Sequence, residues 1–289
     1  VSVKRARGAL WAVLGIVVVL ALVAGGVMLW ANYNKSPLPI QDRCTATAGG
    51  RTTTIDPEQA RNSAIIAGTS IRRGLAPRAA SIALATAYQE SGIRNLDYGH
   101  ADSLGLFQQR PSKGWGTEAQ IMDPWYSTNT FYKAMERVSG WETKDINDVA
   151  QAVQRSAYPD AYRRHVPNAR TLPSSLTGET PAPFTCAVRS PAAADPGGMG
   201  DFLVKTLGKG TITVARTDDT LTVTTKSTQH AWAVAHLAIA NAASYGLASA
   251  HVGPYSWTHS RTSLADWVGS GPTDTAMDVK LVFPGPSPR

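Results

Sequence analysis

The pattern of apolar and polar positions divides the chain into segments of different kinds. The most continuous apolar run covers residues 9–31 and carries no charged side chain. About 20 such residues let a helix cross a bilayer, whereas the apolar core of a cleaved signal peptide, the alternative, usually has about 7–15. Three basic residues lie within 4–7 and only Lys35 follows closely. The positive-inside rule then predicts a cytoplasmic N-terminus, a single transmembrane helix within residues 1–33, and a globular part outside the cell membrane.

Helical patterning dominates the next segment, residues 54–171, after a polar tether over 34–53. Asp56-Pro57, Pro77 and Asp123-Pro124 are typical helix starts, because Asp caps the first turn and Pro suits its first position. We found no stretch that alternates as strands do, so this domain is predicted to be mainly α-helical. The predicted helices begin at Pro57, cover 78–91 and 124–138, run from a cap at 143–145 to about Ser156, and end with a short turn over 160–165.

The C-terminal third has a different pattern. Residues 172–200 are rich in Pro, Gly, Ser, Thr and Ala, which is typical of a linker. Residues 201–289 combine β-branched alternation with an alanine-rich helix, and therefore predict a small α+β domain. Its role and any protein partner are left open by the sequence. Its predicted elements are a hairpin of 211–214 and 221–225 joined across Asp218-Asp219, a helix over 229–245, and strands over 251–257 and 277–283.

Charge and cysteine content add constraints on the environment. The net charge of +7 and a pI near 9.5 would attract any polyanion. Part of the positive charge precedes the apolar run, where it is explained by the membrane orientation predicted above, so no nucleic-acid partner is predicted. Cys44 and Cys186 lie at the two edges of the helical domain. An extracellular location favours a disulfide between them over two unrelated buried thiols.

Glu90 is the first candidate for chemistry. It lies on the last turn of the predicted helix 78–91, where the negative end of the helix dipole disfavours an ionised carboxylate. Partial burial would add to that effect and raise the pKa of the carboxyl. A carboxylic acid that keeps its proton near neutral pH is what glycoside cleavage requires of a general acid. The alternative is a solvated surface glutamate.

The residues around Glu90 favour the first interpretation. Glu90-Ser91-Gly92 is followed by Gly105-Leu106-Phe107-Gln108 and later by Ala157-Tyr158. This order resembles the soluble-lytic-transglycosylase branch of the lysozyme-like superfamily, with its ES, GLMQ-type and AYN-type motifs. Phe107 stands where the family has methionine, and Pro159-Asp160 follows the third motif in place of asparagine and small residues.

The resemblance implies an all-helical lysozyme-like domain that acts on the β-1,4 bond between N-acetylmuramic acid and N-acetylglucosamine. It would make Glu90 the acid and then the base, with Tyr158 orienting it by a hydrogen bond. The other candidate substrate-binding residues are Ser91, Phe107, Gln108, Gln109 and Trp115.

A second carboxylate is the remaining question for a glycosidase. Retaining enzymes place two carboxyls about 5–5.5 Å apart and inverting enzymes about 6.5–9.5 Å. Asp97 and Asp102 lie between the first two motifs, but the family implied needs one carboxylate only, so Asp102 is predicted to be a turn or cap residue. The six histidines are scattered along the sequence, and neither a metal site nor a cofactor is predicted.

Two hypotheses follow from the sequence. The first is a membrane-anchored enzyme that cleaves peptidoglycan glycan strands, of lytic-transglycosylase or muramidase type. The alternative is a non-catalytic cell-wall-binding or assembly protein that uses the same lysozyme-like scaffold.

Overall fold

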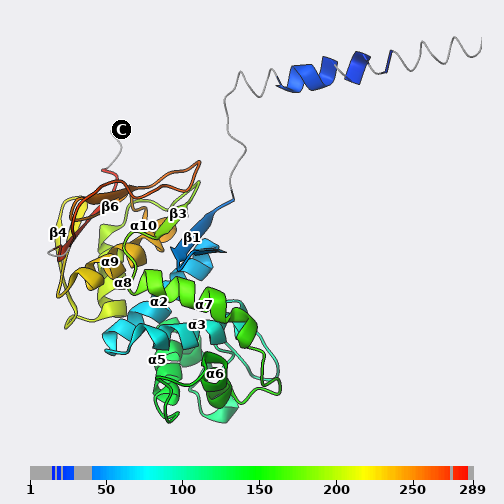
Figure 1. Ribbon diagram of the computed structural model, residues 1–289, viewed down its shortest axis with the longest axis vertical. Coiled ribbons are helices and arrows are strands. Elements are labelled where there is room, and N and C mark those ends of the chain that lie inside the picture. The colour runs from blue at the N-terminus through cyan, green and yellow to red at the C-terminus, as the bar shows by residue number, and fades with distance from the viewer. Residues whose placement is uncertain (1–14, 17, 21, 29–40, 274–275, 286–289) are drawn as a thin grey trace, which may run out of the picture. The chain divides into compact units, whose positions relative to one another are not determined.

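The computed structural model describes residues 15–16, 18–20, 22–28, 41–273 and 276–285 (Figure 1). By its contacts the chain forms two units, Val1–Ile40 and Gln41–Arg289. All elements named below belong to the second unit.

The predicted membrane anchor is not supported. Within the described residues, no helix has the length and apolar content that a membrane crossing requires. The prediction of a transmembrane helix over 9–31 is therefore wrong for the described residues, as is the single-pass cell-membrane localisation built on it, while contact of residues 9–31 with a lipid bilayer stays a prediction. The rest of the predicted tail and anchor, and the tether up to residue 40, lie outside the described residues.

The predicted fold class, a transmembrane helix followed by a mainly α-helical lysozyme-like domain and a small α+β domain, is also wrong, because the second unit contains two antiparallel sheets. The first sheet has the strand order β2-β1-β3. Its threonine-rich strands are polar enough to resemble a tether, yet the branched Cβ of threonine suits a pleated backbone. Segments predicted as tether and linker thus pair in one sheet. Its strands are β1 (Arg43–Ala48), β2 (Arg51–Ile55) and β3 (Phe184–Ala187).

The second sheet has the order β4-β5-β8-β6-β7. The hairpin predicted across Asp218-Asp219 is confirmed as β4 and β5, and the last predicted strand is confirmed as β8. The single strand predicted over 251–257 is instead the hairpin β6-β7, because Gly253 turns the chain with a φ of 53°. The strands are β4 (Ile212–Thr217), β5 (Thr220–Thr225), β6 (Ser249–Val252), β7 (Tyr255–Thr258) and β8 (Asp278–Val282).

The helix starts were the most predictable features. Asp56 caps α2 with its side chain, Pro77 opens α3, and Asp123 caps α5. The helix predicted over 229–245 is split into α9 and α10 at Asn241. The helices are α2 (Pro57–Arg72), α3 (Pro77–Ser91), α4 (Glu118–Ile121), α5 (Pro124–Met135), α6 (Ile146–Gln154), α7 (Val166–Leu176), α8 (Pro196–Leu207), α9 (Thr228–Ile239) and α10 (Ala242–Tyr245), with 3-10 turns at Pro111–Lys113 and Arg163–His165.

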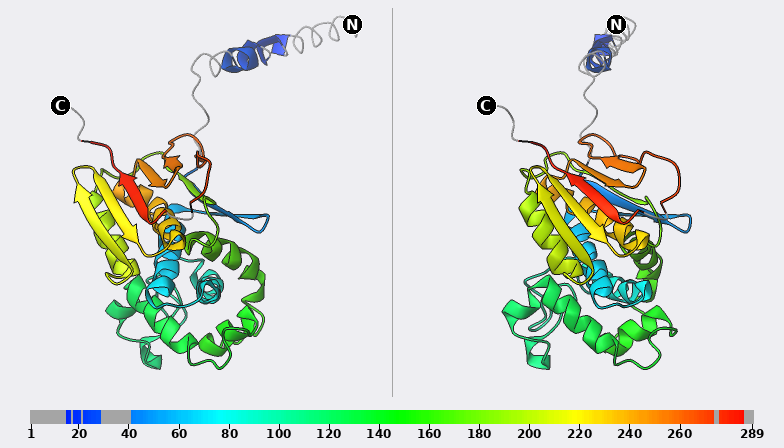
Figure 2. Two further views of the ribbon diagram at one scale, coloured as in Figure 1. Left: turned by 60° about the vertical axis from the view of Figure 1, so that its left-hand side comes forward. Right: turned by 90° about the vertical axis from the view of Figure 1, so that its left-hand side faces the viewer.

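Two central helices organise the packing. Helix α3 is surrounded by α2, α5, α6 and α7, and is viewed along its axis within that ring in the left panel of Figure 2. Helix α2 also contacts α8 and α9, which cover one face of the five-stranded sheet. Gly68 of α2 makes this approach close: a Cβ there would lie 2.3 Å from Thr206 and 2.8 Å from Leu237. One hydrophobic core therefore runs from the helices into the sheet.

The predicted linker, residues 172–200, contains ordered elements. It holds the end of α7, the strand β3 and the start of α8. Pro196 occupies a first-turn position of α8, where the N–H that proline lacks would have no partner within the helix. A high proline content therefore does not by itself indicate a flexible segment. The predicted helical and α+β domains, 54–171 and 201–289, both lie within the compact unit Gln41–Arg289.

Gly178 provides a test of this close packing. It follows α7 with a φ of +74°, and a Cβ at this position would lie 1.9 Å from the carbonyl oxygen of Gln229 and 2.8 Å from the backbone nitrogen of Ala233. Because both obstacles are backbone atoms of α9, we expect Gly178→Ala to lower the free energy of unfolding by about 2–4 kcal/mol. Gly210→Ala is the matched control, since nothing lies within 4 Å of its Cβ position. Denaturant unfolding of both variants checks this, and equal stabilities would contradict it.

Candidate active site

Helix α3 places Glu90 one residue before its C-terminus. Pro77 occupies the first turn, and Gly92 ends the helix with a left-handed φ of 64°. The residues from Ala79 to Ala87 are all buried, whereas Glu90 is half-buried. The buried central helix thus carries a carboxyl in its last turn, where the side chains become partly exposed.

The loop after α3 forms a wall beside Glu90. Ser91 is buried, and its Oγ donates to the carbonyl oxygen of Leu106 at 2.8 Å. Gln109 is buried as well, and its Nε2 donates to the carbonyl oxygen of Ser127 at 3.2 Å. The ring of Phe107 stacks on that of Phe131 with centroids 4.5 Å apart. Ser91, Phe107 and Gln109, which were predicted to bind substrate, therefore stabilise this loop through buried contacts.

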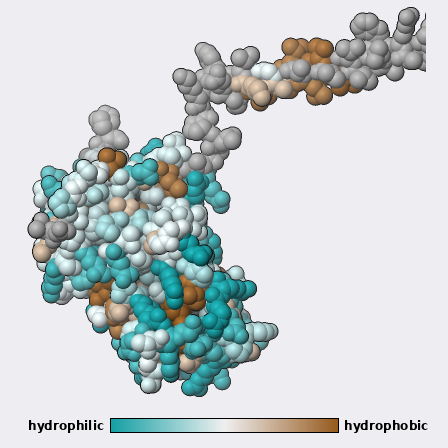
Figure 3. Space-filling model, viewed as in Figure 1, coloured by the Kyte–Doolittle hydropathy of each residue, from teal (hydrophilic) through white to brown (hydrophobic). Residues whose placement is uncertain are grey.

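Glu90 faces an open groove of about 980 Å³ between this wall and helices α5 and α6. The molecular face over α5, α6 and α7 is largely hydrophilic, with a hydrophobic patch among the polar side chains (Figure 3). Of the predicted residues, Gln108 and Trp115 line the groove together with Glu90. The complete lining is Glu90, Ser103, Gln108, Arg110, Lys113, Gly114, Trp115, Thr130, Lys133, Ala134, Arg137, Val138, Ala152, Val153, Gln154, Arg155 and Ser156.

The carboxyl of Glu90 is held by a tyrosine that the sequence interpretation missed. The Oη of Tyr162 donates to Oε1 of Glu90 at 2.7 Å, and the Tyr162 side chain is fully buried. Burial raises the pKa of the Glu90 carboxyl above its ordinary value, whereas hydrogen bonds from Tyr162 and Gln154 lower it by less. The net effect favours the protonated acid.

Tyr158 does not take the predicted role. Its side chain is 75% exposed, it does not line the groove, and the hydrogen bond assigned to it belongs to Tyr162. Two Ala-Tyr dipeptides follow Gly105-Leu106-Phe107-Gln108 in the sequence, Ala157-Tyr158 and Ala161-Tyr162. The second dipeptide was the signal that identifies the partner of Glu90.

Gln154 is a second residue that the sequence interpretation did not single out. It ends α6, lines the groove, and donates from Nε2 to the carbonyl oxygen of Phe107 at 2.8 Å. Its position is therefore tied to the same wall as Gln108. Helix α6 and the loop after α3 meet at this residue.

Asp102 has the structural role expected of it. Its Oδ1 accepts from Arg110 Nε at 2.6 Å and from Ser112 Oγ at 3.0 Å, and its Oδ2 accepts from the Ser112 backbone at 2.7 Å. These hydrogen bonds, the backbone one first, hold the pKa of Asp102 well below its usual range. A carboxylate with these partners fixes the loop. Among the described residues, Glu90 is the only acidic side chain that lines the groove.

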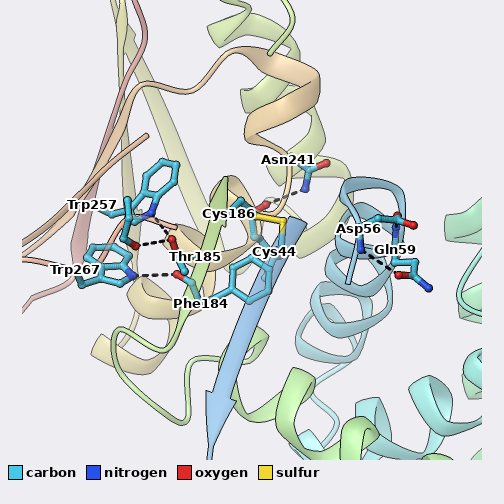
Figure 4. The surroundings of a disulfide bond; sticks show 11 residues. Cys44, Asp56, Gln59, Phe184, Thr185, Cys186, Asn241, Trp257 and Trp267 are labelled. Atoms are coloured by element: carbon cyan, nitrogen blue, oxygen red, sulfur yellow. Dashed lines mark hydrogen bonds between the residues drawn. A yellow bond between two sulfur atoms is a disulfide. The ribbon is translucent and has the colours of Figure 1, made fainter. Parts of the chain in front are cut away.

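The disulfide predicted between Cys44 and Cys186 is confirmed. It joins opposed residues of β1 and β3, and both sulfur atoms are buried (Figure 4). The neighbouring residues of β3 are bound by two tryptophans, one in β7 and one in the loop between β7 and β8. Trp257 donates to Thr185 Oγ1 at 2.9 Å, and Trp267 donates to the Phe184 carbonyl at 3.1 Å (Figure 4).

No protein-family model matches this chain, and no curated protein matches its sequence. The functional argument therefore depends on the residues and geometry described above.

Proposed function

We propose that this protein is a glycosidase of the soluble-lytic-transglycosylase type that cleaves the β-1,4 bond between N-acetylmuramic acid and N-acetylglucosamine in peptidoglycan. One observation carries the proposal. A half-buried glutamate with a raised pKa, bound by a buried tyrosine, lines an open groove of about 980 Å³. Gln108 and Gln154 in the same lining have side-chain oxygens that can accept hydrogen bonds from sugar hydroxyl groups, while their Nε2 atoms donate to backbone carbonyls.

In the first step, the protonated carboxyl of Glu90 gives its proton to the glycosidic oxygen. The bond from C1 of the muramic acid to that oxygen breaks, and the next sugar leaves with a 4-hydroxyl group. Positive charge develops at C1 and its ring oxygen, while Glu90 becomes a carboxylate. Tyr162 stabilises that carboxylate through the hydrogen bond that it already donates.

The second step needs a nucleophile at C1. Because no other carboxylate among the described residues lines the groove, the pair that retaining and inverting enzymes use is not available there. The substrate itself then supplies the nucleophile: its 6-hydroxyl oxygen attacks C1 and Glu90 takes the hydroxyl proton. The product is a 1,6-anhydro end, formed without consuming water, and Glu90 regains its starting protonation state.

The deciding experiment measures turnover of purified peptidoglycan. We expect the protein to release soluble fragments that mass spectrometry identifies as carrying 1,6-anhydromuramic ends. Fragments with hydrated reducing ends would change the second step to hydrolysis and keep the first. If a correctly folded protein releases no fragments, the proposal of an enzyme is wrong and the alternative of a non-catalytic scaffold takes its place.

Tyr162→Phe gives a test of the acid assignment through pH. The hydrogen bond from Tyr162 lowers the pKa of Glu90, so its removal should raise that pKa further. The protonated acid would then persist to higher pH, and the alkaline limb of the profile of kcat/KM against pH should shift to higher pH. The rate below the limb should fall because the carboxylate formed in the first step loses its donor. The exposed Tyr158 serves as the control: Tyr158→Phe should leave the limb in place, and a limb that moves in neither variant would contradict the assignment.

A further inference from the structure

The lining of the groove is strongly cationic. Five basic side chains face it, against the single acidic side chain of Glu90. They come from three parts of the fold: the loop after α3 with its 3-10 turn, the outer side and end of α5, and the C-terminus of α6. These basic residues are Arg110, Lys113, Lys133, Arg137 and Arg155.

Four of these five cations have no counter-ion in the part of the chain that the structure describes. Arg110 is paired with Asp102, whereas Lys113, Lys133, Arg137 and Arg155 are exposed and form no ion pair with any described residue. Two acidic residues that lie close in the sequence are paired elsewhere: Glu136, between Lys133 and Arg137, with Arg73, and Asp160, after Arg155, with Arg163. The positive charge in the groove is thus left for a ligand.

The clustering of these charges has an electrostatic cost. Lys133 lies in the last turn of α5, where the helix dipole favours a cation, and Arg137 lies just beyond the end of that helix. The dipole accounts for one such charge, whereas several unpaired cations around one concave surface repel one another. An anionic ligand in the groove would relieve that repulsion.

We infer that the groove selects glycan strands that carry carboxylates, and that Lys113, Lys133 and Arg137 bind those carboxylates away from Glu90. This inference rests on the proposed function, because it takes the groove as the site of a glycan. Peptidoglycan offers carboxylates from two sources: the lactyl group of muramic acid, when it is not amidated by a peptide, and the peptides themselves. A strand of N-acetylglucosamine alone has neither.

A nucleic acid fits the groove less well. Single-stranded nucleic acids are bound by cations together with several aromatic platforms for stacking bases, and Trp115 is the one aromatic side chain among the described lining residues. The protonated carboxyl of Glu90 can also donate its proton to a glycosidic oxygen, whereas it carries no positive charge to neutralise the phosphates of a nucleic acid.

The test compares binding of the full chain to three glycans. All proteins carry Glu90→Gln so that no glycan is cleaved. The glycans are intact peptidoglycan, peptidoglycan stripped of its peptides by an amidase, and neutral chitin oligosaccharides. The test variant combines Lys113→Gln, Lys133→Gln and Arg137→Gln. The matched control combines Lys209→Gln, Lys226→Gln and Lys280→Gln, which remove the same charge from exposed positions outside the groove.

We expect the test variant to bind peptidoglycan about tenfold more weakly than the control, and to bind chitin equally well. Raising the salt concentration should weaken the control towards the test variant, since exposed ion pairs are screened. A larger loss on stripped strands assigns the lactyl carboxylates, and a larger loss on intact strands assigns the peptides. Arg155 is kept because its left-handed backbone caps α6.

Three results would overturn the inference: equal binding of test and control variants to peptidoglycan, an equal loss on chitin, or tighter binding of the protein to single-stranded DNA than to either peptidoglycan. A second variant, with Lys113→Arg, Lys133→Arg and Arg137→Lys, keeps the charges and should bind like the control, so that a folding defect is recognised. Binding is measured without turnover, so this test is separate from the test of activity. If the wild type cleaves no peptidoglycan but the Glu90→Gln proteins still discriminate glycans by charge, the proposed catalysis is refuted and this inference stands.

Discussion

Replacing Glu90 by glutamine is expected to lower kcat for peptidoglycan cleavage by about 10²–10⁴-fold, the usual contribution of a general acid and base. The amide has the shape of the carboxyl and still accepts the hydrogen bond from Tyr162, but it has no acidic proton to give to the glycosidic oxygen. KM should change little, because the sugar contacts of the groove remain. Release of soluble fragments followed over time, with product analysis by mass spectrometry, measures the loss.

The same substitution should make the protein more stable at neutral pH. Burial raises the pKa of Glu90 in the folded state above its unfolded value, so the folded protein binds the proton more tightly. The free energy of unfolding therefore falls as pH rises from the unfolded pKa through the folded pKa, and the deficit persists above both. Glutamine does not ionise and avoids this cost. Below the unfolded pKa, the variant and the wild type should have equal stability.

Glu142→Gln is the control for both measurements. Glu142 is exposed and does not line the groove, so its substitution should leave turnover unchanged, and its stability gives the reference for the loss of one surface carboxylate. If Glu90→Gln keeps wild-type turnover, Glu90 is not the acid. If it loses turnover together with stability, the loss reflects damage to the fold, and the stability measurement reveals this.

The parts of the fold that could be predicted are those with local causes. Asp56, Pro77 and Asp123 start helices through contacts within one turn, and Asp218-Asp219 joins two strands that are adjacent in sequence. The three-stranded sheet has no such cause. Its strand β3 lies more than 130 residues after β1. Cys44 and Ala46 do alternate with polar residues in β1 and are buried, but such small side chains give only a weak apolar signal for a strand.

The candidate site shows the same division. Glu90 and the wall from Leu104 to Gln109 come from one helix and the loop that follows it, and their motifs lie close together in the sequence. Tyr162 reaches Glu90 from 72 residues away, so choosing between it and Tyr158 required the packing of α7 and its preceding turn against α3. The basic lining was equally hidden, because its members come from three elements and form no run in the sequence.

The disulfide connects the two ends of the segment that builds the candidate site. Cys44 precedes α2 and Cys186 follows α7, so the cross-link closes a loop that contains Glu90, Tyr162 and every residue that lines the groove. Helix α7 packs on both β1 and α3, which joins the sheet that carries the cross-link to the helix that carries the acid. The covalent bond therefore restrains the two ends of the segment that builds the site.

Removing this cross-link is expected to lower the free energy of unfolding by about 4–5 kcal/mol. The two cysteines are 142 residues apart, and in the chain-entropy model a loop of this length gives about that stabilisation, by restricting the unfolded chain. Denaturant unfolding of the double variant Cys44→Ala, Cys186→Ala measures the effect, with the wild type in reductant as a second route to the same state.

The variants separate the cross-link from the packing of the sulfur atoms. If the cross-link dominates, either single variant should lose nearly as much stability as the double variant, because each abolishes the same bond. Reductant should then destabilise the wild type and leave the double variant unchanged. Additive losses in the two single variants would instead assign the effect to the buried volume of each side chain. A loss below about 1 kcal/mol by every route would show that the contacts of β3 with β1, and of Trp257 and Trp267 with β3, already restrain the loop without the bond.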